Sequence, residues 1–403
     1  MKILSSRPWL LMAFFLISNL FSSIAVSIGM YLIPWYISNN AADPTFLATV
    51  ATFSAILILF LTPFIGKLID SFSRKSILIF ITVIILVLFL FLSFSDYLVL
   101  NRLYSLIIAY LFIQIYYAIF YTTRQGFIKD VFKESQLYRI NAILEIESQS
   151  SVLLASFLVI VFSGSLTSTS IFILLAGMAF ISMMMLVVIP YTSKIATDRI
   201  NRRHPLPKLP LSFLKTELFF YMAMGAIPFI CIMTTTAIQA PFMSDVLHKP
   251  ISSFAYYGII YGSGAILVGF IMGRVSNRYS QRNLVLFFTS TFALTLGVIA
   301  LHPTFEFIII GGFFFGFCNS AARISSNNLI LREVESGLIG RAFSYGQFFT
   351  LCGRIIATGL IPLIFINDYQ KVWNYVFAIS MIAPIGLLFR RYLERNSTMP
   401  TQS

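Results

Sequence analysis

Charged residues are scarce in this sequence. They make up 11% of its 403 residues, whereas about a quarter of the residues of a soluble globular protein are charged. Hydrophobic residues account for 58%, and they come in runs of about 20, the length that a helix needs to cross a hydrocarbon core of about 30 Å. The scarcity of charge therefore excludes an ordinary soluble domain, and the long runs predict an all-α integral membrane protein.

Cysteine and histidine are equally rare, with three of each. The cysteines lie inside apolar runs without C-x-x-C spacing, and the histidines lie in three separate loops, so the sequence predicts neither a disulfide framework nor a zinc site. We expect no cofactor. A polytopic membrane enzyme would need a buried histidine or acidic cluster near one interface, and a direct user of ATP would need a P-loop. The sequence therefore favours neither an enzyme nor an ATP-driven pump.

The apolar runs predict about twelve membrane spans. The first is longer than the roughly 7–15-residue core of a signal peptide and lacks a small-residue cleavage site, so we interpret it as a retained helix. The expected spans cover residues 8–33, 45–65, 77–95, 103–123, 142–163, 168–190, 217–241, 252–273, 284–301, 304–326, 342–366 and 372–389.

The distribution of lysine and arginine predicts the orientation. One set of alternate loops, together with both termini, holds nearly all of them, and the opposite set holds only Arg102, Lys249 and Lys371. Because positive charges are retained on the cytoplasmic side of short loops, we expect both termini to be cytoplasmic. This topology also explains the net charge of +13, so no nucleic-acid partner is expected.

The chain divides into two similar parts. The longest polar segment between spans, Thr192–Thr216, contains prolines and a basic cluster and is typical of a linker. Pro34 and Pro241 are as far apart in the sequence as Gly66 and Gly273, which favours a duplication. We therefore predict a six-helix half over 1–191, a cytoplasmic linker over 192–216, a second six-helix half over 217–389 and a cytoplasmic tail over 390–403.

A charged segment between the second and third spans resembles a family signature. Gly66, Asp70, Arg74 and Lys75 stand in the pattern G-x-L-x-D-x-x-x-R-K, which resembles the cytoplasmic loop of the major facilitator superfamily. A weaker copy begins at Gly273, between spans eight and nine. With twelve spans in two halves, the resemblance covers nearly the whole chain.

A second resemblance is narrower. The segment Gly340–Ser344 resembles the start of span eleven in the bacterial macrolide and enterobactin exporters of the superfamily. Span five departs from a pattern common in antiporters, because Ser148–Ala155 contains no Gly-Pro pair, and this leaves the direction of transport open. The resemblance implies a secondary transporter in the cytoplasmic (inner) membrane of a bacterium that works as a monomer on a small molecule and protons, with membrane lipid around it.

The resemblance also implies a cytoplasmic latch, meaning a set of contacts that holds the two halves together in one conformational state. Asp70 is the only acid of its segment, and Arg124 and the start of span eleven are its candidate partners. The two glycines are expected at close helix crossings or strained turns. The predicted latch residues are Gly66, Asp70, Arg74, Lys75, Arg124, Gly273, Asn277, Arg282 and Arg341.

Ionisable groups inside spans are the sharper functional signal, because insertion scales assign about 2.5–3.5 kcal/mol to one at a helix centre. Arg354 lies near the middle of span eleven, where it would suit an anionic substrate, and Glu145 and Glu147 lie in the first turns of span five. The two glutamates are about 200° apart around a helix, so only one faces a given cavity. Each either carries a coupling proton or pairs with Arg124 or Arg139, and the sequence leaves both readings open.

Four polar or aromatic residues near span centres are candidates for a substrate pocket: Asn19, Gln114, Tyr117 and Asn319. Amide hydrogen bonds between helices are the alternative role for each of them. Together these features predict proton-coupled efflux of a drug or siderophore, with import of an organic anion or a metal chelate as the alternative and a polytopic membrane enzyme as a minor one.

Overall fold

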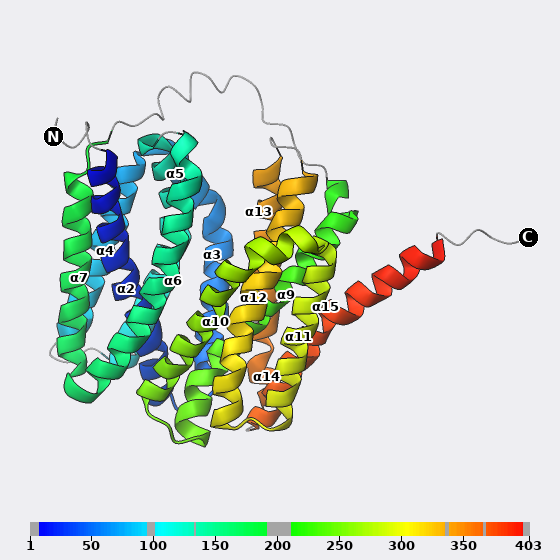
Figure 1. The fold of residues 1–403 in the computed structure, drawn as a ribbon. Helices are drawn as coiled ribbons and strands as arrows, with labels where there is room; N and C mark the ends of the chain where they lie inside the picture. Colours follow the sequence, from blue (N-terminus) through cyan, green and yellow to red (C-terminus); the bar gives the residue numbers. More distant parts are fainter. Residues whose placement is uncertain are drawn as a thin grey trace, which may run out of the picture. The chain divides into compact units, whose positions relative to one another are not determined.

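A computed structural model describes residues 8–94, 101–132, 134–191, 211–334, 338–365 and 368–397 (Figure 1). The described chain is helical throughout, without strands. Its helices are α2 (Pro8–Asn40), α3 (Phe46–Ser71), α4 (Arg74–Phe94), α5 (Arg102–Val131), α6 (Glu134–Ser165), α7 (Ser168–Val188), α9 (Glu217–Pro241), α10 (Ile251–Arg278), α11 (Gln281–Leu301), α12 (Phe305–Glu333), α13 (Ile339–Gly359), α14 (Ile361–Phe365) and α15 (Tyr369–Ser397).

Twelve of the described helices are long and apolar enough to cross a membrane. This confirms the predicted all-α fold class and the expected number of spans. The helix ends differ from the expected ones, because several helices continue past their apolar run. Pro34, which was expected to follow the first span, lies inside α2, as membrane helices allow when neighbouring groups satisfy the carbonyl that proline leaves unpaired.

The loop within the charged segment that carries the family signature is shorter than expected. α3 continues through Ser71, and only Phe72 and Ser73 separate it from α4. Gly66 and Gly273 lie inside helices, no described glycine has a positive φ, and a Cβ added at either position would meet nothing within 4 Å. The expectation that these glycines mark close crossings or strained turns is therefore wrong.

The described residues form two compact units. The described residues of the first lie within 1–44, 56–205 and 248–259, and those of the second lie within 45–55, 206–247 and 260–403. The first residues of α3 thus pack in the second unit and the first residues of α10 in the first. Most of the predicted linker, residues 192–210, lies outside the described residues, and the predicted tail begins as a continuation of α15.

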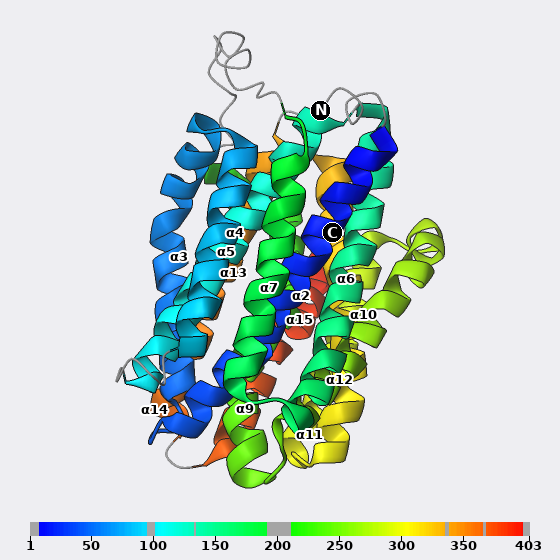
Figure 2. The same cartoon turned by 90° about the vertical axis from the view of Figure 1, so that its left-hand side faces the viewer.

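In the first unit, α7 packs against both α2 and α4, and α2 also packs against α5 and α6. Figure 2 shows α7 lying along α2. In the second unit, α9 packs against α11, α12, α13 and α15. Because α2 contacts three neighbours in its unit, polar residues on its faces are brought against α5 and α6, and this placement assembles the site described next.

Candidate functional site

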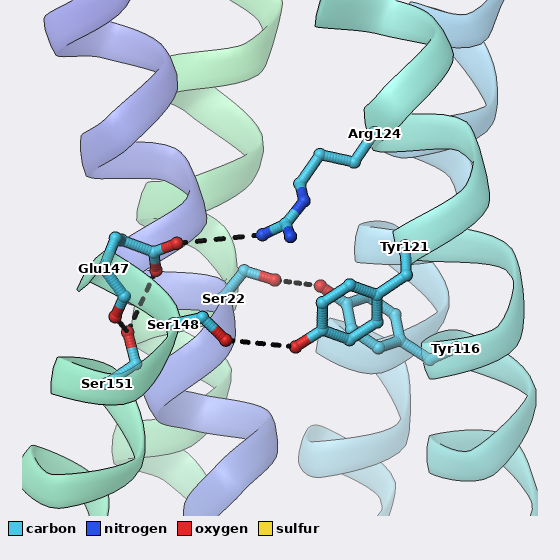
Figure 3. Close-up of polar contacts among 7 residues, drawn as sticks. All are labelled: Ser22, Tyr116, Tyr121, Arg124, Glu147, Ser148 and Ser151. Atoms are coloured by element: carbon cyan, nitrogen blue, oxygen red, sulfur yellow. Dashed lines mark hydrogen bonds and ion pairs between the residues drawn. The ribbon is translucent and has the colours of Figure 1, made fainter. Parts of the chain in front are cut away.

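A cluster of polar side chains lies where α2, α5 and α6 meet in the first unit (Figure 3). α5 begins after Asn101, whose side-chain oxygen accepts a hydrogen bond from the backbone N–H of Leu103 and so caps the helix. α5 then presents Tyr117, Tyr121 and Arg124 at helical spacing of four and three residues, which places them on one face.

The aromatic residues of this face are stacked. The rings of Tyr117 and Tyr121 lie 5.7 Å apart at an interplanar angle of 11°, and the guanidinium of Arg124 lies 4.7 Å from the ring centroid of Tyr121. A cation over an aromatic face is attracted by the ring quadrupole, by about 0.5–2 kcal/mol. The stack therefore fixes the direction in which Arg124 leaves the helix, toward α6.

Glu147 on α6 faces Arg124 from the other side of the cluster. Its side chain is buried, and Ser151, one turn further along α6, donates a hydrogen bond of 2.9 Å to its Oε1. Ser23 on α2 also hydrogen-bonds to the carboxylate. The other oxygen, Oε2, lies 3.8 Å from Nη1 of Arg124 and accepts no hydrogen bond. The carboxylate is therefore held on one side by hydroxyl groups and only loosely by its counter-charge.

Other ion pairs of the described residues are closer. Arg74 and Asp130 are 2.5 Å apart, and Arg282 lies 2.8 Å from Glu217 and 3.1 Å from Glu333. A charge-assisted N–H···O hydrogen bond normally measures about 2.7–2.9 Å. The separation of 3.8 Å between Arg124 and Glu147 is thus too long for a hydrogen bond, although both residues are almost fully buried.

Hydroxyl contacts complete the cluster. Ser22 of α2 and the hydroxyl of Tyr116 share a short hydrogen bond, and Ser148 of α6 lies 3.4 Å from the hydroxyl of Tyr121. Figure 3 shows these pairs beside the Arg124–Glu147 contact, so three helices contribute to one group of polar side chains. Such a network positions Arg124 and Glu147, while some of the polar atoms of these two residues are left without hydrogen-bond partners.

Of the predicted pocket residues, three lie in this unit. Asn19 of α2 is 1% exposed, and its amide nitrogen has no hydrogen-bond partner. Gln114 donates a hydrogen bond of 2.9 Å to the hydroxyl of Tyr110 on its own helix. Tyr117 lies 3.5 Å from the hydroxyl of Ser27. Tyr117 thus contacts a hydroxyl of α2, Gln114 is engaged within α5, and Asn19 is buried with an unpaired donor.

The fourth predicted pocket residue, Asn319, lies at the middle of α12 in the second unit. Its amide nitrogen donates a hydrogen bond of 2.9 Å to the hydroxyl of Tyr261 on α10, and its amide oxygen is buried without a partner. α10 and α12 approach closely here, because a Cβ on Gly316 would overlap the backbone carbonyl of Tyr261, and a Cβ on Gly264 would overlap that of Phe313. The close approach brings Asn319 and Tyr261 together.

The structure gives less information about the two other ionisable candidates, Arg354 and Glu145. Arg354 is half-buried on α13 in the second unit, and its Nε has no hydrogen-bond partner. The side chain of Glu145 lies outside the described side chains. Of the charged residues predicted inside spans, Glu147 is therefore the one that the structure places in an ion pair. Its partner, Arg124, was expected in the latch and also as a possible partner of the two glutamates.

Two residues predicted for the latch, Arg74 and Lys75, tie helix ends together within the first unit. Arg74 donates hydrogen bonds to Asp130 at 2.5 Å and to the carbonyl of Gly126 at 3.0 Å, both at the end of α5. Lys75 donates to the carbonyls of Val187 and Ile189, the C-terminal carbonyls of α7 that lack partners within the helix.

The remaining latch residues lie apart from the cluster. Arg282 joins the starts of α9 and α11 to the end of α12. Asn277 is exposed near the end of α10, and Arg341 lies in the first turn of α13. Asp70 lies in the last turn of α3, and its side chain is outside the described side chains. The latch as a whole stays a prediction.

Several residues of the site were missed in the sequence. Ser151 follows Glu147 by four residues, a spacing that places a hydroxyl on the same helix face, and Tyr121 lies at helical spacing between Tyr117 and Arg124, two residues that the sequence did single out. Those two spacings are visible in the sequence and could have identified the residues. The hydroxyl of Ser22 gave no comparable signal, since nothing in α2 shows which of its serines faces α5.

Comparison with known proteins places the chain in a family. The model of the Major Facilitator Superfamily matches residues 15–271 and 229–402, whereas a search of curated proteins finds no match. Similar solved structures include a D-xylose–proton symporter, with a TM-score of 0.72 and 11% identity over 94% of this chain and 96% of that chain. A nucleoside transporter has a TM-score of 0.71 and 15% identity over 94% and 98%.

A bacterial homologue of the iron transporter ferroportin is also similar, with a TM-score of 0.70 and 13% identity over 94% of this chain and 98% of that chain. Twelve helices of the described residues that are long and apolar enough to cross a membrane, together with the family match, indicate a multi-pass membrane protein with a transporter fold. The chain belongs to the major facilitator superfamily. The family and these neighbours point to a transporter rather than an enzyme, and they do not single out the macrolide and enterobactin branch.

Proposed function

We propose that the protein is a proton-coupled secondary active transporter of a small organic molecule, in which Glu147 carries the proton. The observation behind the proposal is the buried pair of Arg124 and Glu147, whose charged atoms lie 3.8 Å apart without a hydrogen bond. A carboxylate held so loosely exchanges its counter-charge for a proton more readily than one in a short, hydrogen-bonded pair.

Charge balance explains how such a pair couples a proton to transport. With Glu147 ionised, it and Arg124 are together neutral. When Glu147 takes a proton, Arg124 is left in the span without a counter-charge, a state that costs about 2.5–3.5 kcal/mol or more. Protonation must therefore be accompanied by a second event, either a change of conformation that hydrates Arg124 or the arrival of a substrate group that compensates it.

The movement that accompanies transport is alternating access between two halves around a site near the middle of the membrane, as secondary transporters of this architecture use. The cytoplasmic latch around Asp70 belongs to this proposal. Its support is the Arg74 and Lys75 contacts, which hold the ends of α5 and α7 against the start of α4. Through these contacts a change at the charged segment would be carried to α5, the helix that carries Arg124.

Two substrate classes remain candidates. Export of a drug or siderophore follows from the resemblance around Gly340–Ser344. An organic anion or metal chelate, the substrate class of the import alternative, is favoured by the excess of hydrogen-bond donors around Arg124, an excess that concerns the charge of the substrate and not the direction of transport. The similar structures are a D-xylose–proton symporter, a nucleoside transporter and a bacterial homologue of an iron transporter, a range that supports transport of small solutes and selects none of them. The polar cluster favours the second class.

Proteoliposomes that contain the full chain and a trapped pH-sensitive dye test the proposal. A panel of a pentose, a nucleoside, benzoate, citrate, a metal-free catecholate siderophore and a fluorescent organic cation is added outside, and dye response and uptake are recorded. We expect one class to move protons together with itself, and Glu147→Gln to abolish proton movement while labelled substrate still exchanges across the membrane.

Glu306→Gln, an exposed carboxylate at the start of α12, serves as the matched control. Proton movement by Glu147→Gln at the wild-type rate would refute the role of Glu147. Transport of a substrate by the wild type without any proton movement would show a facilitator instead of a coupled carrier.

A further inference from the structure

The polar cluster of the first unit has more buried donors than acceptors. Three nitrogen atoms, Nε and Nη1 of Arg124 and Nδ2 of Asn19, are buried without hydrogen-bond partners, against one such carboxylate oxygen, Oε2 of Glu147. The three residues are 5%, 1% and 8% exposed. Each buried unpaired group costs about 1–3 kcal/mol, so an excess of donors at one place requires an explanation.

Asn19 and Arg124 lie at the same level of the bundle. Phe15 of α2 stacks on Phe127 of α5, with ring centroids 5.2 Å apart, and Ser22 of α2 bonds to Tyr116 of α5. The two helices therefore run antiparallel. Asn19 lies between these two contacts on α2, and Arg124 lies between them on α5.

The face of α2 that carries Asn19 is the one that meets α5 and α6. Ser22 and Ser23 follow Asn19 by three and four residues, which puts all three side chains on one face. Ser22 reaches α5 and Ser23 reaches Glu147 on α6. The unpaired amide nitrogen of Asn19 therefore belongs to the cluster that contains the unpaired nitrogens of Arg124.

We propose that Arg124 and Asn19 form a subsite for an anionic group, a carboxylate or a phosphate, which binds in place of the Glu147 carboxylate. An anion has acceptor oxygens for all three unpaired donors, and guanidinium is the cationic group best suited to planar oxyanions. The inference rests on the proposed function, since the proton that neutralises Glu147 is what makes Arg124 available.

The exchange conserves the charge of the buried site. Before it, Arg124 is positive and Glu147 is negative. After it, Glu147 holds one added proton on its carboxyl group, and the bound anion supplies the negative charge beside Arg124. One proton and one negative charge enter together, so the site is neutral in both states and no unpaired charge is left in the span. The subsite therefore implies one proton bound with each anionic group.

The surroundings of Glu147 contain few other groups that would interfere. α5 contributes Arg124 and the phenols of Tyr116 and Tyr121, while α2 contributes serine hydroxyls, and on α6 itself the side chain of Glu145 is outside the described side chains. Tyr121 is 38% exposed and lies against the guanidinium. The cluster is therefore partly exposed on the side of this ring.

The test measures binding to the purified full chain in lipid nanodiscs, with benzoate, its uncharged analogue benzamide, and inorganic phosphate as probes. Benzoate stays ionised from about pH 6 to pH 8, where only protein groups titrate. We expect wild-type affinity for benzoate to fall up to about tenfold per pH unit as pH rises, since one proton binds with each anion. We expect Glu147→Gln to bind benzoate at least about tenfold more tightly at the upper pH, with little pH dependence.

Further variants locate the subsite. Arg124→Gln should lose about tenfold or more in benzoate affinity, Asn19→Leu should lose less, and Arg102→Gln, which removes an arginine outside the cluster, should bind like the wild type. Arg124→Lys keeps a positive charge and is the second variant if Arg124→Gln does not fold. Phosphate binding in parallel with benzoate would extend the subsite to phosphate, and its failure would restrict it to carboxylates.

Three results would overturn the subsite: benzoate binding by Glu147→Gln no tighter than by the wild type, full affinity in folded Arg124→Gln or Arg124→Lys, or equal binding of benzamide. A gain of benzoate affinity in Glu147→Gln cannot come from misfolding, so the measurement on this variant stays decisive. If that gain is seen but proteoliposomes move no protons, the subsite stands and the proposed coupling fails. If protons move through Glu147 but no anion binds, the proposed function stands and the subsite fails.

Discussion

Arg124 and Glu147 face each other inside the first unit at 3.8 Å, without a hydrogen bond between them. In the same unit, Arg74 and Asp130 lie 2.5 Å apart with a hydrogen bond. Both pairs are largely withdrawn from solvent, so their difference is one of geometry. A short, hydrogen-bonded pair suits a permanent structural contact, whereas a loose pair suits a charge that changes partners.

The first prediction concerns what remains when Arg124 is removed. Arg124→Gln leaves Glu147 as an unpaired buried charge, a change that typically costs about 3–5 kcal/mol. Acid reduces that cost, because protonated Glu147 needs no counter-charge. Thermal unfolding in detergent should therefore show the variant strongly destabilised relative to the wild type at alkaline pH and much less so at acidic pH.

The double variant Arg124→Gln, Glu147→Gln is its control. It removes both charges, so it should recover most of the lost stability at alkaline pH and show no difference between the two pH values beyond that of the wild type. A double variant as unstable as the single one would mean that Arg124 stabilises the bundle by packing on Tyr121 and not by compensating Glu147.

The second prediction compares two arginines at helix ends. The side chains of Arg74 and Asp130 are 13% and 3% exposed, whereas Arg282 and its two partners are exposed by about a third. Exposed ion pairs contribute about 0–1 kcal/mol, and breaking a buried pair costs several times more. Thermal unfolding should show Arg74→Gln clearly more destabilised than Arg282→Gln.

Gly126 offers an independent way to disturb the same pair. A Cβ at this position would lie 2.6 Å from Nε of Arg74, so Gly126→Ala should push Arg74 away from Asp130. We therefore expect Gly126→Ala to show part of the destabilisation that Arg74→Gln shows. Gly177→Ala, where a Cβ meets nothing, is the control and should be neutral or slightly stabilising. Equal behaviour of the two alanine variants would contradict the tight packing around Arg74.

The third prediction concerns the crossing of α10 and α12. A Cβ on Gly316 would overlap the carbonyl of Tyr261, which belongs to the backbone and cannot rotate away. Gly316→Ala must therefore separate the two helices at a cost of about 1–3 kcal/mol and weaken the hydrogen bond between Tyr261 and Asn319. Unfolding temperature and cross-linking yield between cysteines placed on α10 and α12 would both report the separation.

Gly269→Ala is the matched control on α10, since a Cβ there meets nothing within 4 Å. Alanine is the better helix former by roughly 0.5–1 kcal/mol, so this variant should be at least as stable as the wild type. Should Gly316→Ala match it, the two helices pack less closely than described.

Hydrophobic runs and charge placement were enough to predict twelve spans, because each span carries its own signal in composition and length. The ends were predicted less well. Pro34 was expected to end a helix that continues to Asn40, and Gly66 was expected at a crossing but lies in open helix. Both errors treat local propensity as decisive, while in a membrane the backbone stays helical wherever its polar groups would otherwise be unpaired.

The candidate site was predictable only in part. Glu147 stands out in a sequence with few charges in its spans, and its pairing with Arg124 was one of the two readings that the sequence left open, beside the latch role predicted for Arg124. The contact between them depends on how α5 and α6 are rotated about their axes, and that rotation is set by packing of α2 between them. A single sequence contains no direct record of such rotations, so Ser22, Ser23 and Asn19 could not be connected to the pair.

The last prediction concerns the two copies of the charged segment. Aligning Gly66 with Gly273 places Gln281 where the first copy has Arg74. Gln281 forms a hydrogen bond of 3.0 Å to the carbonyl of Ser276 and accepts a longer one of 3.4 Å from Asn328. At the position of Arg74 the second copy thus has neutral hydrogen bonds, which contribute about 0.5–1.5 kcal/mol each, less than charged ones, while Arg282, at the position of Lys75, keeps ion pairs with Glu217 and Glu333.

If the first copy alone works as a charged latch, Asp70→Asn should slow transport markedly, whereas Asn277→Ala, at the aligned position of the second copy, should have little effect. Both variants should insert normally, since each leaves the flanking apolar runs intact. Initial rates of substrate exchange in proteoliposomes, normalised to the amount of folded protein, measure the difference. Equal rates for Asp70→Asn and Asn277→Ala would refute the asymmetry, because neutralising the acid would then matter no more than trimming an amide.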